Sequence, residues 1–309
     1  KGVGGECMNL FKIDQNSLSN LEEKTFKLEQ EIQQLFENNL GVLTGLEFVK
    51  SEFSIQNQRL DTLAFDHETN AFVIIEYKKA TNNSVLDQGV SYLNTLLKYK
   101  ADFILEYQEQ TGKLLTKKDI DWSQSKVVFV SPNFTPFQKQ AVDFKDLNIE
   151  LWEAKRFTNN ILVVNGIVKS ENAPSIKTKT ESSADKELGL LKEIVTYTEE
   201  DHFVGKSEET LECYQDFKQA IFQLVPDLDL EPKKLYIAFK KNKKNIVDIE
   251  IQKKQLKLFI NAKLGQIDDP KNLLKDVSTV GHWGNGDYQI IVKDTTYLEY
   301  IMSCIKQIL

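Results

Sequence analysis

The run Phe72–Tyr77, which reads FVIIEY, constrains the fold of this chain more than any other segment. It is short, apolar and rich in β-branched residues, which is typical of a strand buried on both faces in the middle of a sheet. This strand ends in charge, because Glu76 is followed two positions later by Lys78. Side chains alternate along a strand, so Glu76 and Lys78 are predicted to project from the same face.

The segments on either side of this strand predict an α/β domain built around a mixed sheet. Apolar residues recur at helical spacing over 26–40, whereas 46–55 and 59–66 alternate as strands do. In chain order the expected elements are helix 26–40, strands 46–55, 59–66 and 72–77, helices 84–97 and 101–110, strand 126–131, helix 134–144, and strands 148–154 and 160–168.

The chain has 309 residues, more than one average domain needs, so two domains are expected. The boundary is placed in 169–187, a polar segment with a proline and several serines and threonines. Domain one is then 8–168 and domain two 188–309. Residues 1–7, which precede Met8 and are rich in glycine, are expected to be an expression-tag remnant.

Domain two is expected to be a smaller α+β domain of unknown function. A helix is predicted from about residue 207, capped by Ser207. The strands that follow alternate apolar and polar residues, so one face of their sheet is expected to meet solvent. The expected strands are 234–240, 245–251, 255–262 and 288–293, and a helix follows from about residue 295.

Two features of domain two suit either a binding role or a structural one. Residues 233–263 hold ten lysines and two acidic residues, which fits a phosphate-binding surface or a solvated sheet with protected edges. The loop 276–287 reads DVSTVGHWGNGD and contains His282 and Trp283. It fits a recognition loop or a tight connection whose glycines adopt positive φ.

Composition restricts the setting of the protein. No segment approaches the roughly 20 apolar residues of a membrane span, so no membrane partner is expected. Cys213 and Cys304 lack the spacing of a zinc site or a disulfide framework, which fits a reducing cytoplasm. The net charge of −7 does not indicate a nucleic-acid binder, although a local basic groove is sufficient for phosphate contacts.

Asp61 lies in the expected strand 59–66, and a hairpin with the next strand would bring it beside Glu76 and Lys78. Mg²⁺ or Mn²⁺ prefers oxygen ligands and is commonly held by one or two carboxylates together with substrate phosphate. The lysine could orient or deprotonate the attacking water, or stabilise the charged transition state. Taken alone, a Glu-x-Lys tripeptide is more often a solvated ion pair, and Asp61 alone suits an ordinary strand-edge residue.

Asp61, the 14 residues that follow it, and Glu76-Tyr77-Lys78 resemble the bipartite signature of the PD-(D/E)XK nuclease superfamily. The resemblance covers most of residues 26–168 and implies a restriction-endonuclease-like core. It implies a metal site at Asp61 and Glu76, with these two residues and Lys78 catalytic. Leu60 replaces the proline of the superfamily name, and proline contributes no chemistry there.

The next predicted helix contains a second part of the resemblance. Gln88 and Tyr92 are four positions apart, so both lie on one helical face. They resemble the Gln-x-x-x-Tyr motif of the RecB-like and Cas4-like branches. The resemblance implies a catalytic role for Gln88 and a supporting role for Tyr92.

Members of this superfamily often supply a further acidic residue from the first helix, and here three positions compete. Glu29 and Glu31 flank the apolar face of the helix, and Gln33 is the third option. Glu29 is favoured as a catalytic residue, and the alternative is that it is an ordinary exposed glutamate.

Arg59 and Arg156 are the two arginines of the chain. Arg59 projects from the same strand face as Asp61, where it would contact DNA phosphate or pair with a carboxylate.

The expected function is a Mg²⁺- or Mn²⁺-dependent DNA endonuclease, in repair or in defence against foreign DNA. The GHWGNGD-type loop resembles that of an uncharacterised bacterial C-terminal domain. Such a domain would help to select the substrate, or would bind a protein partner or a second copy of the chain. The alternatives are a non-catalytic nucleic-acid-binding or assembly module that keeps the fold, and a small-molecule or protein-interaction role centred on domain two.

Overall fold

The computed structural model describes residues 9–79, 85–170, 172–175, 194–279 and 286–309. The chain forms two compact units, Lys1–Thr196 and Tyr197–Leu309. The expected tag remnant at 1–7 and the expected N-cap Ser84 lie outside the described residues, as does most of the expected linker. Within the described residues, no helix is both long enough and apolar enough to cross a membrane.

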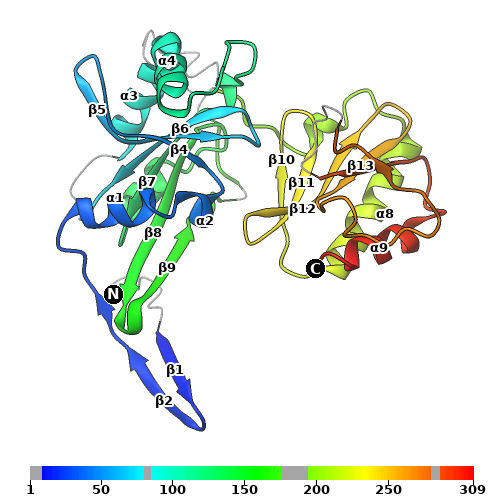
Figure 1. Cartoon of the computed structure of the whole chain (residues 1–309), viewed down its shortest axis with the longest axis horizontal. Coiled ribbons are helices and arrows are strands. Elements are labelled where there is room, and N and C mark those ends of the chain that lie inside the picture. Colours follow the sequence, from blue (N-terminus) through cyan, green and yellow to red (C-terminus); the bar gives the residue numbers. More distant parts are fainter. Residues whose placement is uncertain (1–8, 80–84, 171, 176–193, 280–285) are drawn as a thin grey trace. The chain divides into compact units, whose positions relative to one another are not determined.

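A mixed sheet forms the centre of unit 1, as the sequence predicts (Figure 1). Its strand order in the described residues is β3-β8-β7-β6-β5-β4, with β9 paired to β8. The pairs β6–β7 and β7–β8 are parallel, and the other pairs are antiparallel. The strands are β3 (Glu23–Lys24), β4 (Glu47–Ile55), β5 (Gln58–Asp66), β6 (Ala71–Tyr77), β7 (Lys126–Ser131), β8 (Ile149–Phe157) and β9 (Ile161–Gly166).

Helices cover both faces of this sheet, which is why every residue of β6 is buried. On one face Phe72 and Ile74 pack with residues of α3 and α4. On the other face Val73 and Ile75 pack with residues of α1 and α2. The helices of unit 1 are α1 (Glu29–Glu37), α2 (Leu40–Thr44), α3 (Val85–Lys98), α4 (Lys100–Thr111) and α5 (Pro136–Ala141), with short 3-10 turns at Trp122–Gln124 and Thr158–Asn160.

The helix expected over 26–40 is shorter and interrupted. It ends at Glu37, and α2 begins at Leu40 after Asn39, whose φ of −130° and ψ of 18° are not helical. The side chain of Asn39 donates a hydrogen bond of 2.8 Å to the carbonyl of Leu35. Asparagine competes in this way with the helical backbone bonds, so the helix stops where the apolar spacing alone would continue it.

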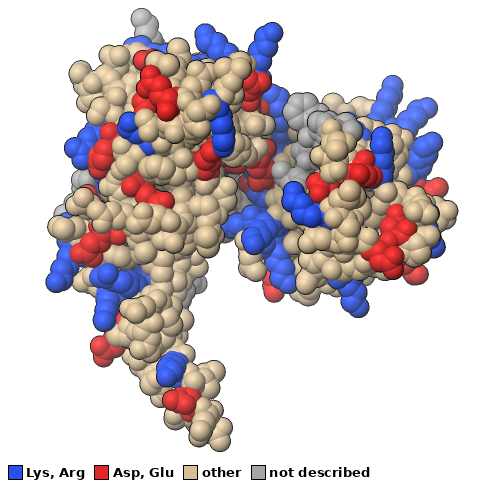
Figure 2. Space-filling view, viewed as in Figure 1, with Lys and Arg blue, Asp and Glu red and all other residues tan. Residues whose placement is uncertain are grey.

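Residues 10–21 form a ribbon that the sequence analysis did not predict. Its strands β1 (Leu10–Asp14) and β2 (Ser17–Leu21) form a separate two-stranded sheet. The ribbon projects from the rest of unit 1 and carries few charged side chains on the visible face (Figures 1 and 2). The register places Phe11, Ile13 and Leu18 on one face, and all three are exposed.

Gly89 lies on the buried side of α3, where a Cβ atom would come within 2.5 Å of Ile149 Cδ1 and 3.2 Å of Phe129 Cε2. Leucine at this position has no space, so Gly89→Leu is expected to lower the free energy of unfolding by about 1–2 kcal/mol. Gly41→Leu is the control, because the nearest atom to its Cβ would be Leu46 O at 4.0 Å. Urea denaturation of both variants checks this, and equal stabilities would contradict the packing described.

Unit 2 combines one antiparallel sheet with two helices on one of its faces. Its strand order in the described residues is β10-β11-β12-β13-β15-β14. The strands are β10 (Asp229–Pro232), β11 (Ile237–Lys241), β12 (Lys244–Ile251), β13 (Leu256–Ile260), β14 (Lys275–Asp276) and β15 (Tyr288–Val292). The helices are α8 (Glu208–Leu224) and α9 (Leu298–Lys306), with a 3-10 turn at Glu200–His202. Ser207 caps α8 as expected and accepts a hydrogen bond from Thr210 N.

The sheet face of unit 2 that points away from the helices is only partly open to solvent, so that expectation was partly wrong. Ala238, Asp248 and Phe259 lie opposite one another on this face, and all three are buried. The Asp248 carboxylate accepts hydrogen bonds from the side chains of Asn245 at 2.8 Å and Asn261 at 3.3 Å. Amide donors compensate for the burial of this charge, which an alternating pattern read from sequence does not reveal.

Candidate active site

Asp61 and Glu76 come together because β5 and β6 form the expected hairpin. The antiparallel register pairs Thr62 with Ile75, and its continuation by one residue places Asp61 opposite Glu76. The Asp61 carboxylate accepts a hydrogen bond of 2.9 Å from the backbone N–H of Tyr77. Asp61 is thereby fixed at the carboxyl end of the central strand β6.

Glu76 and Lys78 form a buried ion pair on one face of the chain. Nζ of Lys78 lies 2.7 Å from Oε1 of Glu76, and the two residues are 9% and 4% exposed, respectively. The predicted common face is therefore observed, but the pair is not the solvated one that such a tripeptide usually forms. The second carboxylate oxygen of Glu76, Oε2, is buried and has no hydrogen-bond partner among the described residues.

Helix α3 brings Gln88 and Tyr92 to the same carboxylate. Nε2 of Gln88 donates to Glu76 Oε1 at 2.8 Å and to the Tyr92 hydroxyl at 2.8 Å. The Tyr92 hydroxyl in turn donates to the carbonyl of Arg59 at 3.3 Å. Oε1 of Glu76 thus receives two donors, whereas Oε2 receives none from the residues that the structure describes.

Burial raises the pKa of Asp61 to about 7, and the negative charge of Glu76 contributes in the same direction. The Tyr77 N–H and the Lys78 ammonium act in the opposite direction but do not compensate. Two carboxylates that repel one another at a buried point favour either a shared proton or a bound cation.

A consequence of this pKa is expected in the metal-free protein. Because the pKa of Asp61 is about 7 in the folded chain and about 3.9 in the unfolded chain, the unfolded state binds fewer protons between these values. Stability should therefore fall as pH rises from about 4 to about 7. Asp61→Asn should not share this fall and should exceed the wild type by roughly 1–3 kcal/mol above pH 7. Urea denaturation with chelator from pH 5 to 8 checks this, and parallel curves would contradict it.

The three first-helix candidates lie in different surroundings. Oε1 of Glu29 accepts a hydrogen bond of 3.1 Å from the backbone N–H of Lys79, next to the site. The carboxylate of Glu31 lies 3.5 Å from Arg156 instead. Gln33 is buried and its Nε2 lies 3.0 Å from the carbonyl oxygen of Asp61. Of these three described side chains, only that of Gln33 forms a hydrogen bond with Asp61.

The two arginines hold local structure in this chain. Arg59 forms an ion pair through Nε with Glu52 of β4 and remains largely exposed. Arg156 donates to the carbonyl of Thr25 at 3.0 Å and stacks over Phe26, 4.7 Å from the ring centroid. Of the two roles considered for Arg59, the structure shows the carboxylate pair.

A divalent cation fits the carboxylates at this point. In the described part of the chain, no group of three or more His, Cys, Asp or Glu side chains is arranged to hold a metal. Mg²⁺ needs only one or two carboxylates, since water and substrate phosphate complete its shell. The unpartnered Oε2 of Glu76 and the neighbouring carboxylate of Asp61 supply such hard oxygen donors.

The lysines of unit 2 do not form one continuous surface. Lys233 and Lys240 both pair with Glu231, at 2.8 and 2.5 Å, and Lys257 pairs with Glu250 at 2.9 Å. The exposed lysines include a group at the β11–β12 turn and another at the β12–β13 turn. Consecutive turns of an antiparallel sheet lie at opposite ends, so the dense stretch read from sequence is divided. Figure 2 shows basic and acidic side chains interspersed on the visible face of this unit.

The glycine-rich loop of unit 2 is described only at its two ends, 276–279 and 286–287. His282, Trp283 and Asn285 lie outside the described residues. At Gly286 a Cβ atom would lie 1.9 Å from the carbonyl oxygen of Ile260, and its φ is not in the positive range. Close approach to β13, and not a positive φ, requires glycine at this position.

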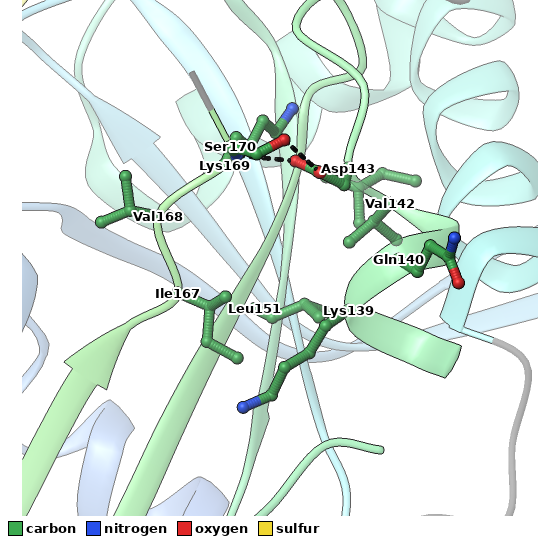
Figure 3. A pocket seen from close by; sticks show the side chains of 10 residues that line it. Lys139, Gln140, Val142, Asp143, Leu151, Ile167, Val168, Lys169 and Ser170 are labelled. Carbon is green, nitrogen blue, oxygen red and sulfur yellow. Dashed lines mark hydrogen bonds between the residues drawn. The ribbon is translucent and has the colours of Figure 1, made fainter. Parts of the chain in front are cut away.

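A cavity of about 310 Å³ lies between α5, β8 and the segment after β9 (Figure 3). Asp61 and Glu76 do not line it. Ile149, Leu151 and Ile167 line it with apolar surface. The polar groups at its rim are already paired, since Ser170 donates to Asp143 from both its backbone and its hydroxyl. Burial lowers the pKa of Lys169 to about 8, and its ammonium donates to the carbonyls of Phe144 and Leu147.

A relative of nearly the same length shows the family. An uncharacterized protein of Haemophilus influenzae (strain ATCC 51907 / DSM 11121 / KW20 / Rd) is 57% identical over 300 residues, which is 97% of this chain and 99% of that protein. The chain belongs to the same family as this protein. Residues 199–307, which make up most of unit 2, match a domain family described as a domain of unknown function (DUF5655).

Three solved structures resemble part of the chain. A repair endonuclease from Pyrococcus abyssi has 19% identity and a TM-score of 0.24, covering 43% of this chain and 50% of that one. A complex of EndoMS with double-stranded DNA has 16% identity and a TM-score of 0.29, covering 47% and 64%. SfsA of Pyrococcus furiosus in complex with Ca²⁺ has 16% identity and a TM-score of 0.25, covering 45% and 62%. The chain thus spans less than two thirds of each of these three proteins.

Proposed function

We propose that unit 1 is a metal-dependent nuclease of the PD-(D/E)XK type that hydrolyses DNA phosphodiester bonds. The observation that carries the proposal is the state of Glu76. It is buried, one of its oxygens is held by Lys78 and Gln88, and the other has no hydrogen-bond partner in the described part of the chain. Its negative charge acts on the neighbouring Asp61. A carboxylate this costly to bury is retained at functional sites more readily than at structural ones.

The residues divide the work as follows. Asp61 and Glu76 would hold Mg²⁺ or Mn²⁺, which when bound polarises the phosphoryl oxygen and promotes ionisation of a water molecule. Lys78 places a positive charge beside the same point and stabilises the negative charge that develops on the phosphoryl group. Gln88 fixes the orientation of Glu76, and Tyr92 fixes Gln88. Glu29, held against the backbone of Lys79, is placed to orient water or substrate.

The alternative is a module that keeps the fold and binds nucleic acid without cutting it. The completeness of the Asp61, Glu76 and Lys78 grouping speaks against this alternative. A chain that only binds DNA gains nothing from a carboxylate pair whose burial and mutual repulsion raise the pKa of Asp61. Unit 2 is proposed to select the DNA substrate or to bind a protein partner. That partner could be a second copy of the chain.

The test is a cleavage assay with the full chain on supercoiled plasmid, linear duplex, single-stranded, branched and RNA substrates. Each substrate is incubated with Mg²⁺, Mn²⁺ or chelator. We expect cleavage of at least one DNA form with metal and none with chelator. Cleavage that persists in chelator, or the absence of cleavage on every DNA form, would contradict the proposal.

A further inference from the structure

The ladder between β4 and β5 is interrupted at Asp61. Ser51 pairs with Thr62, and Phe53 pairs with Leu60, but Glu52 and Asp61 between them do not pair. Glu52 has a φ of +55°, which is unusual for a residue with a Cβ and rare inside a strand. The backbone that presents Asp61 to the site is therefore not secured on this side by a regular strand partner.

The side chain of Gln33 from α1 lies at this interruption, close to both Glu52 and Asp61. Its Nε2 lies 3.0 Å from the carbonyl oxygen of Asp61, 3.2 Å from Oε1 of Glu52 and 3.2 Å from the hydroxyl of Ser51. It also lies 3.0 Å from Oε1 of Glu37, one helical turn further along α1. One buried amide group thus connects α1 to β4 and β5 at the interruption.

The side chain of Glu52 is held from two directions. Gln33 contacts its Oε1, and Arg59 contacts its Oε2. Glu52 is close enough to Asp61 for their negative charges to interact unfavourably. A donor that holds Glu52 and the Asp61 backbone together keeps the two carboxylates in separate, fixed places.

We propose that Gln33 is a positioning residue, which holds the Asp61 backbone at the interrupted ladder so that the Asp61 carboxylate faces Glu76 and can bind a divalent cation. The proposal rests on the proposed function only in taking Asp61 as a metal ligand. It assigns Gln33 no contact with substrate or cation. Groups that orient metal ligands in this way typically change metal affinity or activity by about 10- to 100-fold when removed.

The variant Gln33→Met tests this, because methionine keeps the size of the side chain and removes the N–H donors. Gln34→Met is the matched control, since Gln34 is the next residue of α1 and is exposed. For each full-length protein, the Mn²⁺ dissociation constant is measured by calorimetry, and kcat and KM are measured for DNA cleavage. Thermal unfolding is followed in parallel.

We expect Gln33→Met to weaken Mn²⁺ binding by about tenfold or more and to lower kcat by a similar factor, with KM for DNA unchanged. Gln34→Met should match the wild type. Gln33→Lys restores an N–H donor among the same acceptors, so its affinity should lie closer to the wild type. If Gln33→Met is too unstable to measure, the Mn²⁺ affinity of Gln33→Lys is compared with that of Gln34→Met. Similar affinities would support the positioning role, and a tenfold loss of Mn²⁺ affinity in Gln33→Lys would overturn it.

The outcomes separate the two proposals. If the wild type cleaves DNA and Gln33→Met binds Mn²⁺ and cleaves as well as Gln34→Met, the positioning role is overturned and the nuclease stands. If the wild type cleaves nothing but Gln33→Met loses Mn²⁺ affinity, the positioning role stands and the nuclease is overturned. A wild type that neither binds Mn²⁺ nor cleaves DNA overturns both.

Discussion

Lys78→Met is expected to lower the rate of DNA cleavage by about 10²- to 10⁴-fold. The substitution keeps the length of the side chain and removes the ammonium group that lies 2.7 Å from Glu76. Without this group, Glu76 loses its paired cation, whereas Arg59, which also interacts with the charge of Asp61, is largely exposed and paired with Glu52. The rate constant under single-turnover conditions is the appropriate measurement, because it excludes slow product release.

The control for this variant is Lys79→Met, at the next residue of the chain. Lys79 lies beyond the end of β6 and is exposed, so its loss should change cleavage by less than about threefold at low salt. Equal rates for Lys78→Met and the wild type would remove Lys78 from the mechanism. Equal losses in both variants would assign the effect to DNA binding by general charge.

Gly286→Ala is expected to lower the free energy of unfolding of unit 2 by about 3 kcal/mol, at the upper end of the range for overpacking. Its Cβ would lie 1.9 Å from Ile260 O and 2.8 Å from Asn261 Cα. These are backbone atoms, which cannot rotate away as a side chain does, so the end of β13 or the segment before β15 has to move.

Gly265 provides a control that separates the two reasons for a glycine. It has a φ of +88° and no atom within 4 Å of the Cβ position, so asparagine, which tolerates positive φ, should be less harmful there than alanine. At Gly286, where space decides, asparagine should be at least as harmful as alanine. Thermal unfolding of the four variants checks this pattern, and a milder effect of asparagine than of alanine at Gly286 would contradict the account.

The central strand and the site on it could be predicted because both are local in sequence. The apolar run of β6 predicts burial, and strand alternation alone places Glu76 and Lys78 on one face. The short connection between β5 and β6 makes a hairpin the simplest pairing, which brings Asp61 beside them. Helical spacing similarly predicts that Gln88 and Tyr92 act together, and the structure joins them by a hydrogen bond.

The role of Gln33 could not be predicted, because it depends on contacts between α1, β4 and β5. Its side chain reaches Ser51 and Glu52 only because the ladder between β4 and β5 is interrupted, and a strand pattern in sequence does not mark an interruption. The positive φ of Glu52 is equally invisible, since turn-forming residues such as glycine or asparagine do not occur there. Sequence reasoning favoured Glu29, an acidic side chain of the first helix, and kept Gln33, the amide that contacts Asp61, as an alternative.

Unit 2 was harder to interpret for a related reason. A high lysine count predicts a basic surface only if the strands place the lysines together and leave them unpaired. Here Glu231 pairs with two of them from a strand outside the dense stretch, β10, which the sequence analysis did not predict. The lysine count left open both a phosphate-binding surface and a solvated sheet, and it does not reveal these ion pairs with Glu231.

The most direct test of the central claim compares the wild type with Glu76→Gln in one cleavage time course, with saturating Mg²⁺ and with chelator. Glutamine keeps the shape of the side chain and its contacts at Oε1 but removes the charge that would bind the cation. We expect the wild type to cut DNA only with metal, and Glu76→Gln to be at least about 10²-fold slower while unfolding at a similar temperature. If a folded Glu76→Gln cuts as fast as the wild type, the site described here is not the centre of a nuclease.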